Sequence, residues 1–418
     1  MYYGFKLAAV LWVYYGLTLG MKVGAWGFFA PEISREVGFS ATEIGLVAGI
    51  VLAGTAVFTP IAGLFISRYG CKKSMILGLA LGAGGMLATS MGTNLLGFSF
   101  GAVLLAASTS FSGVVPLQTL TTLWFDKYRS RAMAVIFTGT PIWGALSYPL
   151  YGYMLTLGTW RMALVVLTLI FPLGLVLVLL FVKDSPAQIG EPVDGIEAKD
   201  SVHPPEAISK PQKSTSEGDG AGWTVKTALL SPLFALITLS VVVCTLPYIF
   251  FVTYGRLLLE SVNVSTGVAV AALAGLALAT LAGRLSASLA DFIDARLLVM
   301  GALISNVTGI TAILMSQTDL LVYASVFLIG LSFGLAFIIA PILLARVFGT
   351  AVFAPIEGMR MSIVVGLNAG LTPVFGYLIE ISGSYLLPLQ IILSVNGIAV
   401  LGLGLNILVA RFRRLESA

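Results

Sequence analysis

The chain has 418 residues, of which 58% are hydrophobic and only 10% are charged. Soluble domains carry about 25% charged residues, so this composition excludes a water-soluble enzyme and indicates a protein with many membrane-spanning segments. Residues 184–226 alone contain eight acidic and four basic side chains. The remaining basic excess lies in short segments between apolar stretches, which is typical of a membrane protein and not of a nucleic-acid-binding protein.

Apolar stretches of about 20 residues, the length of a helix that crosses a bilayer, recur along the whole chain. Each is too long for a transmembrane strand, and none alternates apolar and polar residues with a period of two. We therefore predict an all-α membrane protein whose twelve transmembrane helices form two pseudosymmetric six-helix bundles. In chain order, the predicted spans are residues 5–30, 42–66, 74–92, 95–123, 132–155, 163–182, 227–254, 264–290, 297–316, 319–344, 359–381 and 386–410. No small-residue cleavage site follows the first span, so we expect a mature helix and not a signal peptide.

The polar stretch in the middle of the sequence divides the chain into three parts. We predict an N-terminal bundle at residues 1–183, a flexible cytoplasmic linker at residues 184–226 and a C-terminal bundle at residues 227–418. Five prolines, together with Ser, Gly, Lys and Glu, leave the linker too little apolar surface to form a core. A regulatory role for the linker is the alternative interpretation.

Basic residues are distributed unequally between the two sides of the predicted bundle. With the N-terminus inside, the cytoplasmic side carries fourteen Lys and Arg residues, whereas the outer side carries only Arg35, Arg161 and Arg256. Basic connectors remain on the cytoplasmic side of a membrane. We therefore expect a multi-pass protein of the cell (inner) membrane, surrounded by lipid, with both termini in the cytoplasm.

The predicted loop between the second and third spans contains a recognisable motif. Gly63, Arg68 and Gly70, followed by Lys72 and Lys73, resemble the pattern of the major facilitator superfamily: Gly, three residues, Asp-Arg, one residue, Gly and then basic residues. The arrangement of six plus six helices is also similar to that family. The resemblance implies a transporter that works by alternating access.

Two features of this motif bear on gating. Ser67 replaces the Asp of the superfamily pattern, so we expect a weaker charge relay at the inner gate. A degenerate copy follows 224 positions later at residues 287–296, where the acid is kept as Asp291 but Ala287 replaces the first Gly. Such a repeat is expected of a pseudosymmetric transporter. The resemblance therefore makes Arg68 and Asp291 candidate gating residues.

The entry to the fifth span carries a more specific resemblance. Residues 124–132 read Trp-Phe-Asp-Lys-Tyr-Arg-Ser-Arg-Ala, which is similar to a signature of the monocarboxylate transporter family and its bacterial organic-anion relatives. Residues 3–5 and 183–190 resemble further parts of those proteins, although the acid that often precedes the first of these is missing. Lys127 and Arg129 lie within the signature and are further candidate gating residues.

Two cations lie at membrane depth, Lys22 in the first span and Arg284 in the eighth. No Asp or Glu occupies the middle of a predicted span. An unpaired cation at this depth costs at least about 2.5–3.5 kcal/mol, and such residues usually line a pathway. A carboxylate is the natural complement, because a guanidinium holds it with two parallel hydrogen bonds. Alternatively, Lys22 extends to the outer headgroups and Arg284 pairs with Asp291, two turns away on the same helix face.

Other polar residues in the spans are weaker candidates for substrate contact. The monocarboxylate transporter family has an Arg at the position that corresponds to Arg284. In that family an Asp thought to carry the proton often lies four positions before this Arg. Here that position is Thr280, so the proton is expected to travel on the substrate or on Lys22. Each of the remaining candidates is equally compatible with an interhelical hydrogen bond or an interfacial position. These candidates are Gln118, Tyr148, Tyr151, Tyr248 and Asn368.

The leading hypothesis is a secondary transporter for a small organic anion, such as the monocarboxylates lactate and pyruvate, with proton symport. The alternative is an organic-anion exchanger of the oxalate/formate type that uses both cations on a dianion. An efflux pump for cations would need a membrane-buried acid. We expect no enzymatic activity, because the predicted spans contain no His, and Cys71 and Cys244 lie at different depths. We expect a monomer with no cofactor, no metal and no nucleic-acid partner.

Overall fold

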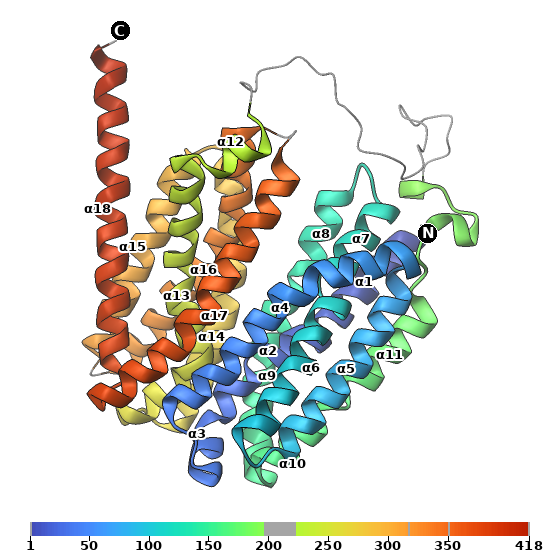
Figure 1. The fold of residues 1–418 in the computed structure, drawn as a ribbon, viewed down its shortest axis with the longest axis horizontal. Coiled ribbons are helices and arrows are strands. Elements are labelled where there is room, and N and C mark those ends of the chain that lie inside the picture. The colour runs from blue at the N-terminus through green and yellow to red at the C-terminus, as the bar shows by residue number, and fades with distance from the viewer. Residues whose placement is uncertain (1, 196–222, 317, 350–351, 417–418) are drawn as a thin grey trace.

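The computed structural model describes residues 2–195, 223–316, 318–349 and 352–416. Within these ranges the chain forms helices and turns and contains no strand. The helices fall into two groups that stand side by side, here called the first half and the second half (Figure 1). The predicted all-α fold of two helical bundles is confirmed.

The first half contains the helices that precede the central linker. Several spans are interrupted, so one span can comprise more than one helix. The helices are α1 (Tyr3–Tyr15), the π-helical turn η1 (Gly16–Gly20), α2 (Met21–Val23), α3 (Ala25–Val37), α4 (Ala41–Tyr69), α5 (Cys71–Met91), α6 (Leu95–Ser112), α7 (Val114–Trp124), α8 (Arg129–Phe137), α9 (Gly139–Leu157), α10 (Trp160–Leu167) and α11 (Ile170–Phe181).

The second half follows the linker and has longer uninterrupted helices. Two short 3-10 helices, η2 (Pro186–Ile189) and η3 (Val193–Gly195), precede it along the chain. Its helices are α12 (Val225–Leu229), α13 (Pro232–Ser261), α14 (Thr266–Ser286), the 3-10 helix η4 (Ala287–Asp291), α15 (Ala295–Leu314), α16 (Asp319–Phe348), α17 (Phe353–Ser382) and α18 (Leu386–Glu416).

In the described part of the chain, eleven helical segments are long and apolar enough to cross a membrane. The predicted fifth span is not among them, although α8 and α9 are helical across almost all of it. Helix α9 is rich in Gly, Pro, Tyr and Trp because it packs against the π-helical turn η1 and, across the interface between the halves, against α14. Several of these residues are buried within the protein, and their side chains give α9 a lower mean hydropathy than the other spans.

The first predicted span, residues 5–30, is longer in the structure and extends to Val37. The prediction ended the span where charged residues begin. The structure instead continues the helix, because the charged side chains of α3 find ionic partners within the protein.

The two halves meet most closely at one end of the molecule. At this end, which we call the α3–α4 end, α3 packs against α13 and α4 packs against α17. At the opposite end, which we call the linker end, the halves are farther apart, and α12 and both termini lie there (Figure 1). A glycine permits the close approach of α4 and α17, because a Cβ atom at the Gly376 position would collide with the carbonyl oxygen of Ala41.

The start of the predicted linker packs against the first half. The Asp184 carboxylate accepts a 2.8 Å hydrogen bond from the amide of Lys72 in the first turn of α5, and Asp194 accepts from the amides of Asp126 and Lys127. Glu191 accepts from the amide of Tyr3. Residues 184–195 are therefore fixed by three carboxylates, whereas residues 196–222 of the predicted linker lie outside the described residues.

Candidate functional site

Arg284 extends from α14 into the interface between the two halves. Its Nη1 atom donates a 2.6 Å hydrogen bond to the carbonyl oxygen of Phe137, at the end of α8 in the first half. The ring of Phe337 lies under the guanidinium, 5.3 Å from its central carbon. The Nε atom is buried without a hydrogen-bond partner. No ion pair to Arg284 exists among the described residues, although the Asp291 side chain is outside them.

Lys22 lies in α2, immediately after the π-helical turn. Its Nζ atom donates a 2.8 Å hydrogen bond to the Thr109 hydroxyl on α6, inside the first half. The side chain is partly buried and has no acidic partner in the part of the chain that the structure describes. π-Helical turns often occur at functional sites, and this one directly precedes the helix that carries Lys22. Lys22 and Arg284 thus contact different partners.

Tyr148 on α9 and Tyr248 on α13 lie near each other across the interface between the halves. Tyr148 is buried and packs so tightly against Gly24 that no Cβ atom fits there. Tyr248 stacks on Phe333 with ring centroids 3.8 Å apart and also lies near Arg284. The neighbouring Tyr151 donates a hydrogen bond to the Met21 carbonyl. Both predicted tyrosines are therefore at the interface that contains Arg284.

The other three predicted substrate residues have partners or positions of different kinds. Thr280 is buried where α14 meets α16, and its hydroxyl donates to the Ala277 carbonyl of its own helix. Asn368 is buried on α17; its amide donates a 3.0 Å hydrogen bond to Thr245, and its Oδ1 atom has no partner. Gln118 on α7 is exposed.

The predicted gating residues lie at the linker end, and their contacts in this conformation are local. Arg68 is exposed and lies over the Tyr69 ring, with its central carbon 5.4 Å from the centroid. Lys127 is exposed, and Arg129 pairs with Asp126 at 3.5 Å. The described contacts of these three cations therefore stay within the first half. Asp291 closes η4, and its side chain is outside the described residues.

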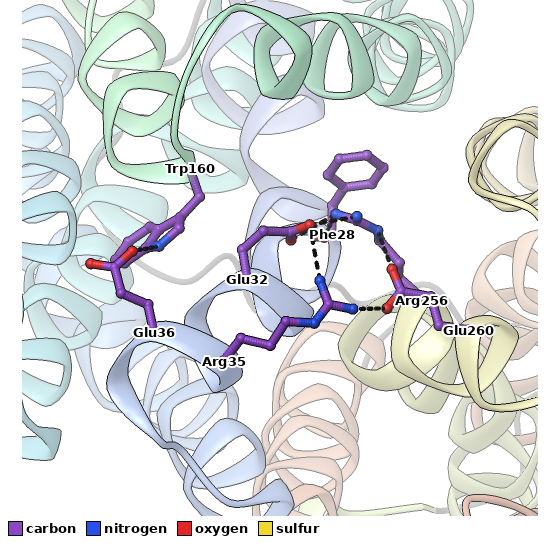
Figure 2. Close-up of polar contacts among 7 residues, drawn as sticks. All are labelled: Phe28, Glu32, Arg35, Glu36, Trp160, Arg256 and Glu260. Atoms are coloured by element: carbon purple, nitrogen blue, oxygen red, sulfur yellow. Dashed lines mark hydrogen bonds and ion pairs between the residues drawn. The ribbon is translucent and has the colours of Figure 1, made fainter.

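A network of four charged residues joins the halves at the α3–α4 end (Figure 2). We call it the interhalf charge network: Glu32 and Arg35 on α3, and Arg256 and Glu260 on α13. Both Nη atoms of Arg256 bond to the Glu32 carboxylate, at 2.8 and 2.6 Å. Arg256 also reaches Glu260 at 3.1 Å, and Glu260 in turn binds Arg35 at 2.6 Å.

Arg256 is the buried centre of this network, with only 4% of its surface exposed. It donates a further 2.6 Å hydrogen bond to the Phe28 carbonyl, and its central carbon lies 4.5 Å from the Phe28 ring centroid (Figure 2). The adjacent Glu36 binds Trp160 and Arg161 within the first half. Bidentate, desolvated pairs of this kind are the strongest ionic contacts in proteins. Sequence reasoning missed the network, and the only signal was opposite charges at the predicted outer ends of two spans.

Two more contacts hold the same end closed. The Glu380 carboxylate at the end of α17 accepts a 2.7 Å hydrogen bond from the amide of Thr42, in the first turn of α4. The Tyr254 hydroxyl lies 2.9 Å from the Thr372 carbonyl and 3.1 Å from that of Ala41. Helix N-termini attract negative charge, so Glu380 stabilises α4 from the opposite half.

A match to a protein family decides the identity of this fold. The sequence model of the family described as Major Facilitator Superfamily matches residues 11–354 of this chain. The chain belongs to the major facilitator superfamily. This superfamily member is a multi-pass membrane protein, and the relatives and structural neighbours that it matches are transporters.

Relatives with assigned functions match parts of the chain. The hexuronate transporter of Bacillus subtilis is 26% identical over 202 residues, which is 47% of each chain. Monocarboxylate transporter 3 of Rattus norvegicus is 26% identical over 145 residues, 33% of this chain and 30% of that one. The 4-hydroxybenzoate transporter PcaK of Acinetobacter baylyi is 27% identical over 169 residues, 36% and 35% of the two chains. The matched regions thus span half or less of each relative.

Solved structures match over nearly the whole chain and show the fold alone. The nucleoside transporter NupG superposes with a TM-score of 0.74 at 11% identity, covering 95% of this chain and 98% of that one. A bacterial homolog of the human lysosomal transporter Spinster, in an inward-facing and unoccupied conformation, gives a TM-score of 0.64 at 14% identity, with 95% and 92% covered.

Proposed function

We propose that this protein is a secondary transporter for a small organic monocarboxylate, of the size of lactate or pyruvate, and that it works by alternating access with proton symport. The observation that carries the proposal is Arg284, a guanidinium between the two halves with a buried, unpaired Nε atom and no acidic partner among the described residues. A buried donor without a partner is costly, and a carboxylate supplies both the missing acceptor and the opposite charge.

The names of the relatives support the substrate class. The hexuronate, monocarboxylate and 4-hydroxybenzoate transporters differ in the rest of their substrates but share one chemical group, a carboxylate. The protein site that matches a shared carboxylate is a fixed cation. We therefore assign the carboxylate to Arg284, and the aromatic rings of Tyr148, Tyr248 and Phe333 to the surroundings of the substrate.

The contacts between the halves support alternating access. From the distribution of basic residues we infer that the linker end lies in the cytoplasm of the cell and the α3–α4 end outside. With this orientation, the interhalf charge network closes the outer end while the halves are apart at the cytoplasmic end (Figure 1). We assign the conformation as inward-facing, and the opposite conformation requires the network to separate.

Position 280 offers no carboxylate to carry the coupling proton, because it is occupied by Thr280, which forms a hydrogen bond within its own helix. We propose that the proton enters with the substrate or on Lys22, whose Nζ atom has one hydroxyl partner and no acid among the described residues. Arg68, Lys127, Arg129 and Asp291 are proposed to act at the linker end when that end closes.

Uptake by purified protein in liposomes tests the proposal. Labelled lactate and pyruvate should accumulate when the outside is acidic, and a protonophore should abolish the accumulation. Arg284→Ala should weaken anion binding about tenfold or more, the effect of losing a hydrogen-bonded charge partner. Arg131→Ala removes an exposed cation of the 124–132 signature in the first half and should change binding less than twofold. Absence of uptake for every monocarboxylate, with or without a pH gradient, would refute the substrate class.

The two intramembrane cations also favour a second candidate, an exchanger of the oxalate/formate type. In this conformation Lys22 and Arg284 have separate partners on α6 and α8. Counterflow of labelled oxalate against formate, without any proton-driven uptake, would support exchange and exclude symport.

A further inference from the structure

The hydrogen bond from Arg284 uses a carbonyl group that a proline has left free. In a continuous helix the carbonyl of Phe137 would accept from the amide four residues later, which is position 141. Pro141 has no N–H and cannot make that bond. The helix is interrupted at Thr138, between α8 and α9. The Nη1 atom of Arg284 donates a 2.6 Å hydrogen bond to the free carbonyl of Phe137.

A second proline in the first half shows the same chemistry in a different setting. Pro116 leaves the Ser112 carbonyl without its helical donor, and the buried Tyr14 hydroxyl donates to it at 2.9 Å. Carbonyl groups freed inside a membrane are expected to find such donors. The Tyr14 bond is neutral and stays within one half, whereas the Arg284 bond is charged and crosses between the halves. The bond from Arg284 is therefore the one that can affect a substrate site.

Three sides of the guanidinium are defined by what surrounds it. One face lies over the Phe337 ring, and the Nη1 atom is held by the Phe137 carbonyl. The Nε atom is buried and unpaired, and Nη2 donates no hydrogen bond within the described residues. Nε and Nη2 form one edge of the guanidinium, and this edge matches the two oxygens of a carboxylate.

We propose that Pro141 is a positioning residue for substrate binding. By withholding its N–H, it provides the carbonyl that anchors Nη1 and turns the Nε–Nη2 edge of Arg284 toward the carboxylate. The inference rests on the proposed function, because it assigns a role in binding the same anion. Preorganisation of this kind favours affinity, since the side chain does not have to be ordered when the anion arrives.

Pro141→Ala tests the proposal, because the new N–H can bond to Phe137 and displace Arg284. We expect about a tenfold rise in the Kd for lactate, measured by calorimetry on purified protein, consistent with loss of one charge-assisted hydrogen bond. Preference for lactate over its neutral amide should fall with it. Pro149→Ala is the matched control, because Pro149 lies in the same helix but is exposed; it should change the Kd less than twofold.

A double-mutant cycle distinguishes positioning from a general effect on the helix. An ammonium has no Nε–Nη2 edge, so in an Arg284→Lys protein the Pro141→Ala change should have almost no further effect. An equal loss in both backgrounds, or an unchanged Kd in folded Pro141→Ala protein, would overturn the proposal. If the Ala variant does not fold, Pro141→Gly also restores the N–H and is measured in its place. Failure of wild-type protein to bind any monocarboxylate would instead refute the proposed function.

Discussion

Arg284 and Lys22 are both cations in apolar spans, yet the structure gives them different surroundings. Arg284 crosses to the other half and bonds to a backbone carbonyl, whereas Lys22 bonds to a hydroxyl within its own half. The alternative in which Lys22 extends to the outer headgroups does not describe this conformation, because its Nζ atom is bonded to Thr109 on α6. Neither residue has an acidic partner among the described residues.

Substitution of Lys22 tests the role of its charge. Lys22→Gln can keep a hydrogen bond to Thr109 but removes the charge, so we expect the fold to remain and the KM for lactate to rise about tenfold. Thr109→Val is the control that keeps the charge and removes its partner. Initial uptake rates in liposomes provide the measurement. An unchanged KM in Lys22→Gln would exclude Lys22 from substrate binding.

The sequence identifies candidate residues whose chemistry is unusual for their surroundings, and it fails where the partner is remote or is backbone. Arg284 and Lys22 stand out because the residues around them are apolar. The Phe137 carbonyl has no side-chain signature, so the contact of Arg284 could not be predicted. Glu32 and Arg256 lie 224 positions apart, and each looks like an ordinary charge at the end of a span until the halves are assembled.

At the scale of elements, the close contact between α14 and α16 depends on glycine. A Cβ atom at Gly334 would collide with the Thr280 carbonyl, and one at Gly330 would collide with that of Leu276. Small residues allow membrane helices to approach in this way. The two glycines lie four residues apart on one face of α16, and this spacing is visible in the sequence. The sequence does not show which helix packs against that face.

Gly334→Ala tests this packing. The added methyl group meets backbone atoms that cannot move without separating the helices, so we expect a loss of about 1–3 kcal/mol in stability, typical of overpacking. Gly366→Ala in α17 is the control, because nothing lies within 4 Å of a Cβ at that position. Thermal denaturation in detergent compares the two. Equal melting temperatures would contradict the tight contact.

The N-terminus of helix α5 is capped by Asp184, which follows the last helix of the first half along the chain. Asp184 accepts from the Lys72 amide, and Gly70 before it has a positive φ of 89° that favours glycine. The resemblance to monocarboxylate transporters singles out this segment, but the composition of residues 184–226 predicts a flexible linker from its first residue. Three acidic side chains that bind backbone amides fix residues 184–195 instead.

Asp184→Ala should therefore destabilise the first half. Loss of an N-terminal cap costs about 1 kcal/mol, and the melting temperature should fall accordingly. Asp126→Ala provides the comparison, because that acid lies at the same end with 74% of its side chain exposed. A surface pair of this kind contributes little to stability. Equal stability of both variants would show that the Asp184 contact has no capping role.

For the whole molecule, the interhalf charge network is an ionic link between the two halves whose central arginine is buried. It combines one buried arginine with two carboxylates and a second, exposed arginine. Breaking a buried pair by removing one partner is far more costly than losing an exposed one. The network should therefore set how readily the α3–α4 end opens.

Glu32→Gln removes the bidentate partner of Arg256, so it should favour opening of the α3–α4 end. Arg35→Gln is the control, because Arg35 is exposed and its loss leaves the Glu32–Arg256 pair in place. Distances between spin labels at the α3–α4 end measure the opening. We expect a larger population of long distances in Glu32→Gln only. Identical distributions in both variants would show that the network does not hold this end closed.

The arrangement of the helices follows largely from hydropathy, and the assembly of the halves does not. Counting apolar stretches predicts the fifth span, although α8 and α9 are the least apolar part of the bundle. Apolar length reports contact with lipid, so it cannot show which spans face each other. The contacts of α3 with α13 and of α4 with α17 come from small residues and charges, whose partners lie in the other half.

The π-helical turn at Gly16–Gly20 lets the first span hold one additional residue. Such a turn winds one residue more into a turn than the α-helix around it. Because the extra residue is taken up within the turn, deleting one residue there would restore regular α-helical winding and leave the later side chains of the span near their present directions. Lys22 would then keep its hydrogen bond to Thr109, and Glu32 would keep its pair with Arg256. The span therefore tolerates a change of one residue at this turn without losing either polar contact.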